Sequence, residues 1–478
     1  MLTERMSWGL LGFTLLLVLA AAGVVHFYPG YLTNTQYLCA TILLEILAAV
    51  VWNYRQRFVP ALIVVFLGAG FYTPAQSAFS AIRWLVLAVG ALVGIVLYLH
   101  EREHWFGVFH GIALSCVLSA FASAAISDYP QEACLKAASL LLLFAYAMTG
   151  ARLAAFRHMT KFVAGLQIAL EILTYVTGVA YFVFHYPLLG NPNSLGAVMG
   201  VCVLPLLVWA ELANGVRGRR RRLFALLLAL SLLLSSYSRA SIGASFVTIS
   251  LLCIALRQYK FLIRGIVLAL IAAVVVATLV PLKSNDSIEN QPPVKKFLYK
   301  GHPTQDMLAS RRNVWDETWD SIRVHPLFGT GFGTSETSGS AERTQSNGLS
   351  VSSNAGVREH GNSYLAILEW QGLLGVVPFV ALILCLGSYL VRVWSWVWRG
   401  GDSSSPSIAL ACTMTAGLFH SAFEDWLFAV GYYLCVFFWI MAFIFVDVLP
   451  ARGAPEVEYR RAFLAGELPS SEAIASGR

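Results

Sequence analysis

The stretch "REHGNSYLAILEWQGLLG" (358–375) begins with charged and polar residues and continues as an apolar helix. Together with the residues up to 392 it is long and hydrophobic enough to cross a membrane, for which about 20 apolar residues suffice. The polar start of such a segment has two interpretations: an ordinary helix end at the lipid boundary, or part of a functional site. The choice depends on which side of the membrane this boundary faces.

The composition of the whole chain is that of a membrane protein. Of the 478 residues, 58% are hydrophobic and 12% are charged, and the mean hydropathy is +0.68. Soluble domains carry about 25% charged residues, so the sequence predicts a polytopic membrane protein. The net charge of +7 follows the loops between apolar segments, which indicates membrane topology and not nucleic-acid binding. The eight cysteines lie in or beside apolar runs, without the spacing of a zinc site or a disulfide framework.

About fourteen segments qualify as membrane spans, and because some are short the expected number is roughly 12–14. The predicted spans are residues 7–26, 36–52, 58–72, 82–99, 106–126, 133–149, 161–184, 194–213, 223–237, 241–256, 262–282, 364–392, 407–426 and 427–448. The expected fold is an all-α transmembrane helix bundle. It has spans in 1–282, a long periplasmic loop in 283–362, further spans in 363–449 and a disordered cytoplasmic tail in 450–478.

The basic residues predict how the bundle lies in the membrane. Of the 33 lysines and arginines, 21 fall on the side of the N-terminus, three (Arg83, Lys136 and Arg239) on the other side, and nine in the long loop. Because short cytoplasmic loops are rich in Lys and Arg, we expect both termini in the cytoplasm. The long loop and the start of the 364–392 span then face outward.

The long loop combines an amphipathic segment with a Gly-rich turn. The stretch "SRRNVWDETWDSIRVHP" (310–326) has a helical pattern that Pro326 ends. The predicted apolar face consists of Val314, Trp315, Thr318, Trp319 and Ile322. The turn "LFGTGFG" (327–333) and a Ser/Gly/Asn-rich stretch (334–356) follow. Long loops are usually functional or disordered, and we expect both kinds of segment here.

Three arginines on the outer side are candidates for binding an anion. Arg239 lies in "SSYSRASIGAS" (235–245), a polar break between two short apolar segments, where an arginine is costly unless it has a partner or a function. Arg311 and Arg312 open the amphipathic helix, where positive charge opposes the helix dipole. A bound phosphate would favour both guanidinium groups. The alternatives are a snorkelling anchor at Arg239 and a solvated pair at 311–312.

Carboxylates and a histidine are expected at the same boundary. The residues are Glu359, His360, Asn362, Glu369, Glu424 and Asp425, with His420 beside the last two. Glu369 lies about two turns inside the span, where a carboxylate needs a partner or a wet cavity. Helix capping alone would explain Asn362. Gly372 and Gly375 permit close helix contact.

Four stretches together resemble the bacterial O-antigen ligase/polymerase family of integral-membrane glycosyltransferases. They are "GNPNSLGAVM" (190–199), "YSRASIGA" (237–244), "SRRNVWDETWDSIRVHPLFGTGFG" (310–333) and "HGNSYLAILEWQGLLG" (360–375). Family members often have His-Asn before the Gly-x-x-Gly pair, whereas here Gly361 holds the histidine position and His360 is one residue early. Either the start of the helix shifts so that His360 substitutes, or this chain does not use that histidine. The departure favours an exopolysaccharide-polymerase-like branch.

The resemblance implies a glycosyltransferase of the bacterial inner membrane that needs neither metal nor cofactor. Its donor would be an oligosaccharide on polyprenyl pyrophosphate, and its acceptor a hydroxyl of a glycan or of lipid A–core, with membrane lipid around it and no nucleic acid. By the same resemblance the pyrophosphate would be bound by Arg239, Arg311 and Arg312. The base would be His360, Glu369 or Glu424, and Asn362 would cap the helix or contact the acceptor.

Three other classes of protein stay open at this point. A polysaccharide or lipid-linked glycan transporter (flippase-like) would often show internal repeats, and none is evident in the sequence. Another class of lipid-linked glycosyltransferase uses acidic residues in its first outer loop, which here reads "HFYPGYLTNT" (26–35) without a carboxylate. A structural membrane protein without chemistry is the third.

Overall fold

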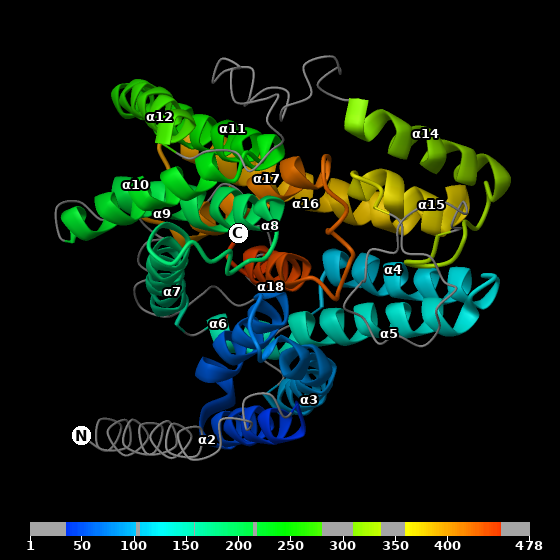
Figure 1. The fold of residues 1–478 in the computed structure, drawn as a ribbon. Helices are drawn as coiled ribbons and strands as arrows, with labels where there is room; N and C mark the ends of the chain where they lie inside the picture. The colour runs from blue at the N-terminus through cyan, green and yellow to red at the C-terminus, as the bar shows by residue number, and fades with distance from the viewer. Residues whose placement is uncertain are drawn as a thin grey trace.

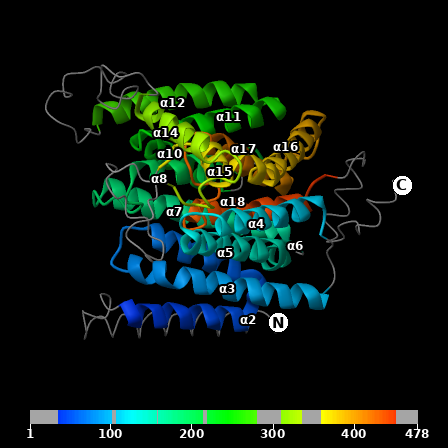
Figure 2. The ribbon, with the colours of Figure 1, turned by 90° about the vertical axis from the view of Figure 1, so that its right-hand side faces the viewer.

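The computed structural model describes residues 35–101, 106–156, 158–213, 218–279, 309–335 and 359–450. The predicted span 7–26, the tail after residue 450 and the loop segments 283–308 and 336–358 lie outside these ranges. Within them the chain is helical and has no strand, so the predicted all-α class is confirmed. Figure 1 shows the helices packed into one bundle, and in Figure 2 most of them run roughly parallel.

Most of the predicted spans that lie in the described ranges coincide with helices. The predicted spans 407–426 and 427–448 are an exception, because residues 422–432 between α17 and α18 are not helical. The N-terminal half contains α2 (Thr35–Gly70), α3 (Gln76–Glu101), α4 (Val108–Ala125), α5 (Pro130–Tyr146), η2 (Ala147–Ala151), α6 (Arg152–Phe156), α7 (Met159–Phe182), α8 (Pro192–Ala197), η3 (Val198–Val203) and α9 (Leu204–Ala213). The second half contains α10 (Arg219–Ser235), α11 (Arg239–Ala255), α12 (Tyr259–Leu279), α14 (Ala309–Val324), α15 (Ser363–Gly375), α16 (Val377–Trp398), α17 (Pro406–Ser421) and α18 (Tyr433–Asp447). Six helical segments of the described chain are long and apolar enough to cross a membrane, and α11 and α18 are shorter apolar helices.

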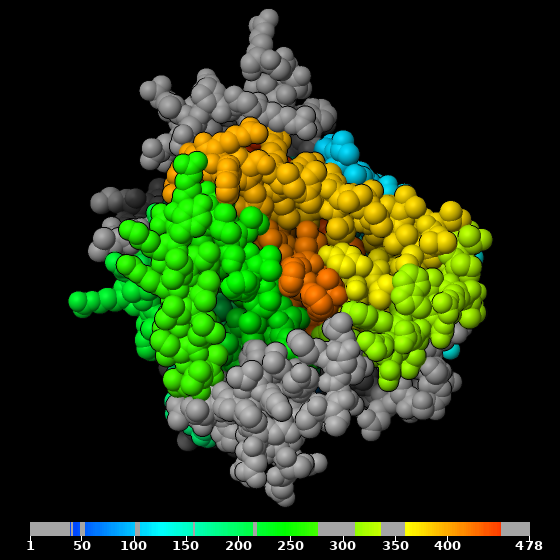
Figure 3. Space-filling view, turned by 90° about the horizontal axis from the view of Figure 1, so that it is seen from above, coloured from blue at the N-terminus to red at the C-terminus, as the bar shows by residue number. Residues whose placement is uncertain are grey.

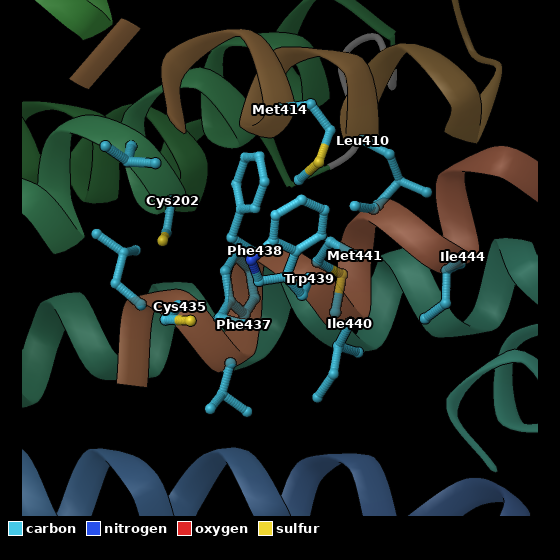
Figure 4. Packing of buried hydrophobic residues seen from close by; sticks show 14 of the residues in the cluster. Cys202, Leu410, Met414, Cys435, Phe437, Phe438, Trp439, Ile440, Met441 and Ile444 are labelled. Atoms are coloured by element: carbon cyan, nitrogen blue, oxygen red, sulfur yellow. The ribbon is translucent and has the colours of Figure 1, made fainter. Parts of the chain in front are cut away.

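Helix α18 forms the centre of the bundle. It is apolar on all sides, and its residues from 433 to 445 are buried, which is the pattern of a helix enclosed by others. It packs against α2, α5, α6 and α17. Figure 4 shows Phe438 and Trp439 of α18 lying beside Met414 of α17. The hydrophobic core therefore surrounds a helix close to the C-terminus, and the earlier helices are arranged around it.

Two helical regions have internal breaks. The predicted separation of 36–52 from 58–72 corresponds to a kink in α2 at Asn53, whose backbone is extended and whose Oδ1 accepts a hydrogen bond from the backbone N–H of Gln56 (3.3 Å). The prediction of one continuous span over 364–392 is wrong. Gly372 has φ +62°, α15 ends at Gly375, and α16 begins at Val377. A left-handed residue interrupts the helical hydrogen bonds, and glycine adopts that conformation without steric cost.

The predicted amphipathic helix exists as α14 and ends at Val324, two residues before the proline. Thr318 and Ile322 are buried, as the pattern predicts. Trp319, assigned to the same face, is 46% exposed, so that assignment is wrong. Successive residues of a helix point about 100° apart, and residue 319 therefore faces away from α15, the helix that α14 contacts.

Candidate active site

Asn362 sets the start of α15. Its backbone is extended, and its Oδ1 accepts hydrogen bonds from the backbone N–H groups of Tyr364 (2.8 Å) and Leu365 (3.2 Å). This is the geometry of a helix N-cap, which stabilises a helix by about 1 kcal/mol relative to alanine. The cap fixes the direction in which residues 359–361 leave the helix.

The segment 422–432, which joins α17 to α18, is tied both to α15 and to the core. Ser363 Oγ donates to the carbonyl oxygen of Glu424 (2.6 Å) and accepts a hydrogen bond from the N–H of Leu427 (3.1 Å). The carbonyl of Leu427 accepts a further hydrogen bond from the indole N–H of Trp439 (2.7 Å). These bonds hold the acidic residues 424 and 425 beside the start of α15, although 61 residues separate Ser363 from Glu424 along the chain.

His360 lies between two carboxylates and is 1% exposed. Its Nε2 is 2.8 Å from Glu369 Oε2, and its Nδ1 is 3.2 Å from Asp425 Oδ2. Its backbone N–H also donates to Asp425 Oδ2 (2.8 Å). Burial alone would lower the pKa of His360, but the hydrogen bonds and charges of Asp425 and Glu369 outweigh burial and raise it. His360 is therefore favoured as an imidazolium that donates from both ring nitrogens.

Gly361 explains why the histidine stands one position early. Its φ is +60°, and a Cβ at this position would lie 3.3 Å from Arg311 Nη1. A side chain would therefore be strained by the backbone and crowded by the arginine. With glycine here, the chain turns so that the ring of His360 enters the bundle and meets Glu369, while the carbonyl of Gly361 faces Arg311.

Arg311 connects α14 to the polar residues before α15 and to the acidic segment 422–432. Its Nη2 donates to Glu424 Oε1 (2.8 Å) and its Nη1 donates to the carbonyl oxygen of Gly361 (2.8 Å). The side chains of Arg311 and Glu424 are 23% and 24% exposed, so the ion pair is partly accessible. Burial raises the pKa of Glu424; Arg311 opposes this shift, and the negative charges of Asp425 and Glu359 add to it. The result is an accessible carboxylate with a raised pKa, next to a fixed positive charge.

Arg239 approaches the same place from the other half of the bundle. It is the first residue of α11, and Ser241 in the same first turn lies 3.0 Å from His420 at the end of α17. Burial lowers the pKa of Arg239, and the positive charge of Arg311 lowers it further. In the view from above (Figure 3), the orange segment around residue 420 lies between the green helices that include α11 and the yellow-green and yellow α14 and α15. Two like charges are thus held near each other at one end of the bundle, an arrangement that an anion would stabilise.

A second buried histidine supports the turn that carries Arg239. His420 is 1% exposed, and its Nδ1 accepts a hydrogen bond from the indole N–H of Trp426 (2.8 Å). Its Nε2 lies 3.0 Å from Ser241 Oγ, and this hydroxyl lies 2.8 Å from Ser238 Oγ. Because Nδ1 accepts, the neutral ring carries its proton on Nε2 and donates it to Ser241. The chain of hydrogen bonds links the start of α11 to the acidic segment 422–432.

The Gly-rich turn 327–333 packs into the break in α15. A Cβ on Gly372 would lie within 2.6 Å of backbone atoms of residues 327–329, so only glycine permits this approach. The N–H of Leu373 donates to the carbonyl of Pro326 (2.8 Å), and the N–H of Thr330 donates to the carbonyl of Glu369 (3.0 Å). The sequence predicted a contact between helices at Gly372. The contact is with the backbone of the turn, which thereby helps to position Glu369.

Two serines of α4 and a third just after its end, at intervals of four residues, bind the broken part of α15 and the Gly-rich turn. Ser119 Oγ donates to the carbonyl of Gly375 (2.7 Å), Ser123 Oγ to that of Trp370 (2.7 Å) and Ser127 Oγ to that of Thr330 (2.6 Å). A broken helix leaves carbonyl groups without their usual partners, and hydroxyls can satisfy them. The serines were not among the predicted site residues, although the spacing of Ser119 and Ser123 in an apolar span is a visible signal of a shared helix face.

The predicted site residues fall into two groups. The structure brings together Arg239, Arg311, His360, Glu369, Glu424 and Asp425. Arg312 is exposed on the neighbouring position of α14, where its side chain projects in a different direction from that of Arg311. Among the residues with a described position, no group of three or more His, Cys, Asp and Glu could hold a metal ion. Metal-independent chemistry stays a prediction.

The fold and this cluster define a multi-pass membrane protein with an arginine- and carboxylate-lined site at one end of its helix bundle. Residues 224–380 match the model of the O-antigen ligase family, and this match supports the assignment of the chain to that family. The matched region, about a third of the chain, includes Arg239, Arg311, His360 and Glu369 but ends before Glu424. No sequence among the curated proteins matches the chain.

Proposed function

We propose that the chain transfers or polymerises a glycan carried on polyprenyl pyrophosphate, as an inner-membrane glycosyltransferase of surface polysaccharide synthesis. The observation that carries this proposal is the ion pair of Arg311 with the accessible carboxylate of Glu424. The start of α11, which carries Arg239, is tied to the same acidic segment through Ser241, His420 and Trp426. Transfer from a pyrophosphate carrier needs positive charge at the leaving group and a base at the acceptor. The cluster offers both, and the O-antigen ligase match is consistent with this substrate class.

The two arginines would bind the pyrophosphate. In the transferase reaction an acceptor hydroxyl oxygen bonds to C1 of the donor sugar while the bond from C1 to the phosphate oxygen breaks. The leaving pyrophosphate takes both electrons of that bond, so negative charge grows on its oxygens. Arg311 and Arg239 would stabilise this charge through charge-assisted hydrogen bonds, and the planar guanidinium can hold two phosphate oxygens at once.

Glu424 would accept the proton of the acceptor hydroxyl. In the free protein Arg311 donates to its Oε1 and lowers the pKa that burial raises. When Arg311 turns to the pyrophosphate, the carboxylate loses that partner and becomes more basic. Binding of the donor would thus make Glu424 a stronger base, because Arg311 would leave the carboxylate and bind the pyrophosphate.

His360 would act as a positioning residue in this scheme. Its ring is 1% exposed and is favoured in the charged form between Glu369 and Asp425. An imidazolium has no lone pair with which to accept a proton. Its effect on the reaction would come through Asp425, which adjoins Glu424. The base role that the resemblance suggested for His360 would then belong to Glu424 in the acidic segment.

The proposed orientation puts the site at the periplasmic face and both termini in the cytoplasm. The support is the distribution of basic residues outside the long loop, where 21 lie on one side and three on the other. The acceptor would be a second lipid-linked glycan or lipid A–core. Deletion of the gene separates these: single repeat units on lipid A–core indicate a polymerase, and accumulated lipid-linked polymer indicates a ligase.

The assignment of the base is tested by the pH dependence of kcat/KM for three proteins: wild type, Glu424→Gln and His360→Gln. We expect Glu424→Gln to lower the rate about 10²- to 10⁴-fold and to abolish the acidic limb of the profile. His360→Gln should be slower but retain that limb. Loss of the acidic limb in His360→Gln, with a normal limb in Glu424→Gln, would return the base role to the histidine.

A further inference from the structure

A pocket of about 360 Å³ lies at the opposite end of the bundle from Arg311. It is formed where α9, α11 and α16 end, and its lining includes Leu212, Arg257, Trp398, Arg399 and Ser403. Helix α11 begins at the candidate active site with residue 239 and ends at this pocket with residue 255. The pocket is therefore separated from the active site by the full length of that helix.

Two of these helices end in the same backbone motif, with different residues at its left-handed position. After α16, the N–H of Gly400 donates to the carbonyl of Val397 (3.0 Å) and the N–H of Gly401 donates to that of Trp396 (3.1 Å), with φ +95° at Gly400. This is the Schellman motif, which usually carries glycine at the left-handed residue. The end of α16 therefore follows the usual rule.

Helix α11 ends in the same motif with an arginine at the left-handed residue. The N–H of Arg257 donates to the carbonyl of Ile254 (3.0 Å) and the N–H of Gln258 donates to that of Cys253 (2.7 Å), while φ of Arg257 is +57°. A side chain at this position is strained where glycine would not be. The sequence thus keeps a long cationic side chain at a position where the backbone favours glycine.

The charge of the pocket is positive. Arg257 and Arg399 are both exposed, and within the described parts of the chain neither guanidinium has a hydrogen bond or ion pair with a carboxylate. The dipoles of the ends of α11 and α16 favour cations, which accounts for arginines near these helix ends but not for one in the strained position. An anion held between the two side chains would account for that position as well.

We propose that this pocket binds the phosphate of an anionic phospholipid headgroup. Basic pockets between transmembrane helices bind such headgroups, and guanidinium groups grip phosphate oxygens in pairs. Gln258 and Ser403 in the lining can donate to the remaining oxygens. Trp398, 51% exposed at the end of α16, and Leu212 supply the apolar border next to which an acyl chain would lie.

The test is native mass spectrometry of the purified full-length chain with added phosphatidylglycerol, with phosphatidylcholine in a parallel sample. We expect the wild type to retain one phosphatidylglycerol in preference to phosphatidylcholine. The double variant Arg257→Gln/Arg399→Gln should reduce that retention about tenfold or more, since it removes both charged groups that would hold the phosphate. Arg264→Gln, an exposed arginine on α12 that does not line the pocket, is the matched control and should retain the lipid.

Arg257→Gly separates a binding role from a structural one. Glycine suits the left-handed position, so this variant should melt no earlier than the wild type yet lose the lipid preference. Equal retention of the two lipids by the wild type, or unchanged retention in the double variant, would overturn the proposal. Retention of phosphate from millimolar inorganic phosphate alone, as strong as that of phosphatidylglycerol and without a preference between the lipids, would assign the pocket to free phosphate. That result would overturn the lipid assignment.

Discussion

Arg311 offers the most informative single perturbation, because it contacts the acidic segment and the start of α15 at once. Arg311→Ala removes the hydrogen bonds to Glu424 Oε1 and to the carbonyl of Gly361, both 2.8 Å long. The two side chains of the ion pair are 23% and 24% exposed. Exposed pairs contribute about 0.2–1 kcal/mol and breaking a buried pair costs about 3–5 kcal/mol, so a loss of about 1–2 kcal/mol of stability is expected.

The effect on turnover should exceed the effect on stability. Removing one positioned donor from a developing negative charge lowers kcat about 10²- to 10³-fold, or about 2.7–4 kcal/mol. Arg311→Lys keeps the charge but offers a point charge in place of a planar fork, so we expect an intermediate loss. Arg312→Ala is the matched control, because this arginine is exposed on the next position of the same helix, and its rate should stay within about threefold of the wild type.

A second readout follows from the pKa of Glu424, which Arg311 lowers. In Arg311→Ala this pKa rises further, so the acidic limb of the residual activity should move to higher pH. The assay is the initial rate of glycan transfer from a polyprenyl-pyrophosphate donor, measured across pH for each purified variant beside its melting temperature. A rate for Arg311→Ala within threefold of the wild type, or an equal loss in Arg312→Ala, would refute the pyrophosphate-binding role.

Three further predictions concern the residues that support the site and the topology of the chain. His360→Gln should cost about 3–5 kcal/mol of stability at acidic pH, because it breaks the buried contacts with Glu369 and Asp425. The folded pKa of His360 is raised, so the part of this stability that depends on the charged ring is complete below pH about 6.5 and is lost as pH rises through the folded value. The melting temperatures of the two proteins should therefore approach each other as pH rises, and a gap that widens would contradict the ion pairing. Gly372→Ala, with φ +62° and backbone within 2.6 Å of the new Cβ, should destabilise the protein by at least about 2 kcal/mol in a denaturation assay, and an unchanged midpoint would contradict the packing. Cysteines introduced at Ser346 and Ser403 should react with a membrane-impermeant reagent from opposite sides, only Ser346→Cys from the periplasm, and labelling from one side would exclude the topology.

Much of the helical framework follows from hydrophobic length alone. Apolar stretches of about 20 residues predict membrane helices because the bilayer leaves no alternative partner for the backbone. The polar turn around Arg239 and the start of α14 were expected on one side because the chain changes side with each span. That argument needs no side-chain contact, and it brings Arg239 and Arg311 to the same end of the bundle, as the structure does.

The contacts within the cluster could not be predicted in the same way. His360 meets Asp425 across 65 residues of sequence, and apolar spans do not specify which helices become neighbours. The left-handed glycine at 372 is invisible to a hydropathy scan, because a glycine in an apolar run reads as helix. The apolar sequence of α18 predicted a membrane span, but it did not predict that this helix forms the centre of the bundle.

The proposed reaction is tested most directly by following both products of one turnover. The purified full-length chain in vesicles is given a polyprenyl-pyrophosphate-linked oligosaccharide and an acceptor glycan, and the released polyprenyl pyrophosphate and the elongated acceptor are both quantified. Glycosyl transfer predicts the two products in equal amounts, with neither formed in the Arg239→Ala/Arg311→Ala variant. Movement of the intact lipid-linked oligosaccharide across the vesicle membrane, with no polyprenyl pyrophosphate released, would contradict the account and identify a transporter.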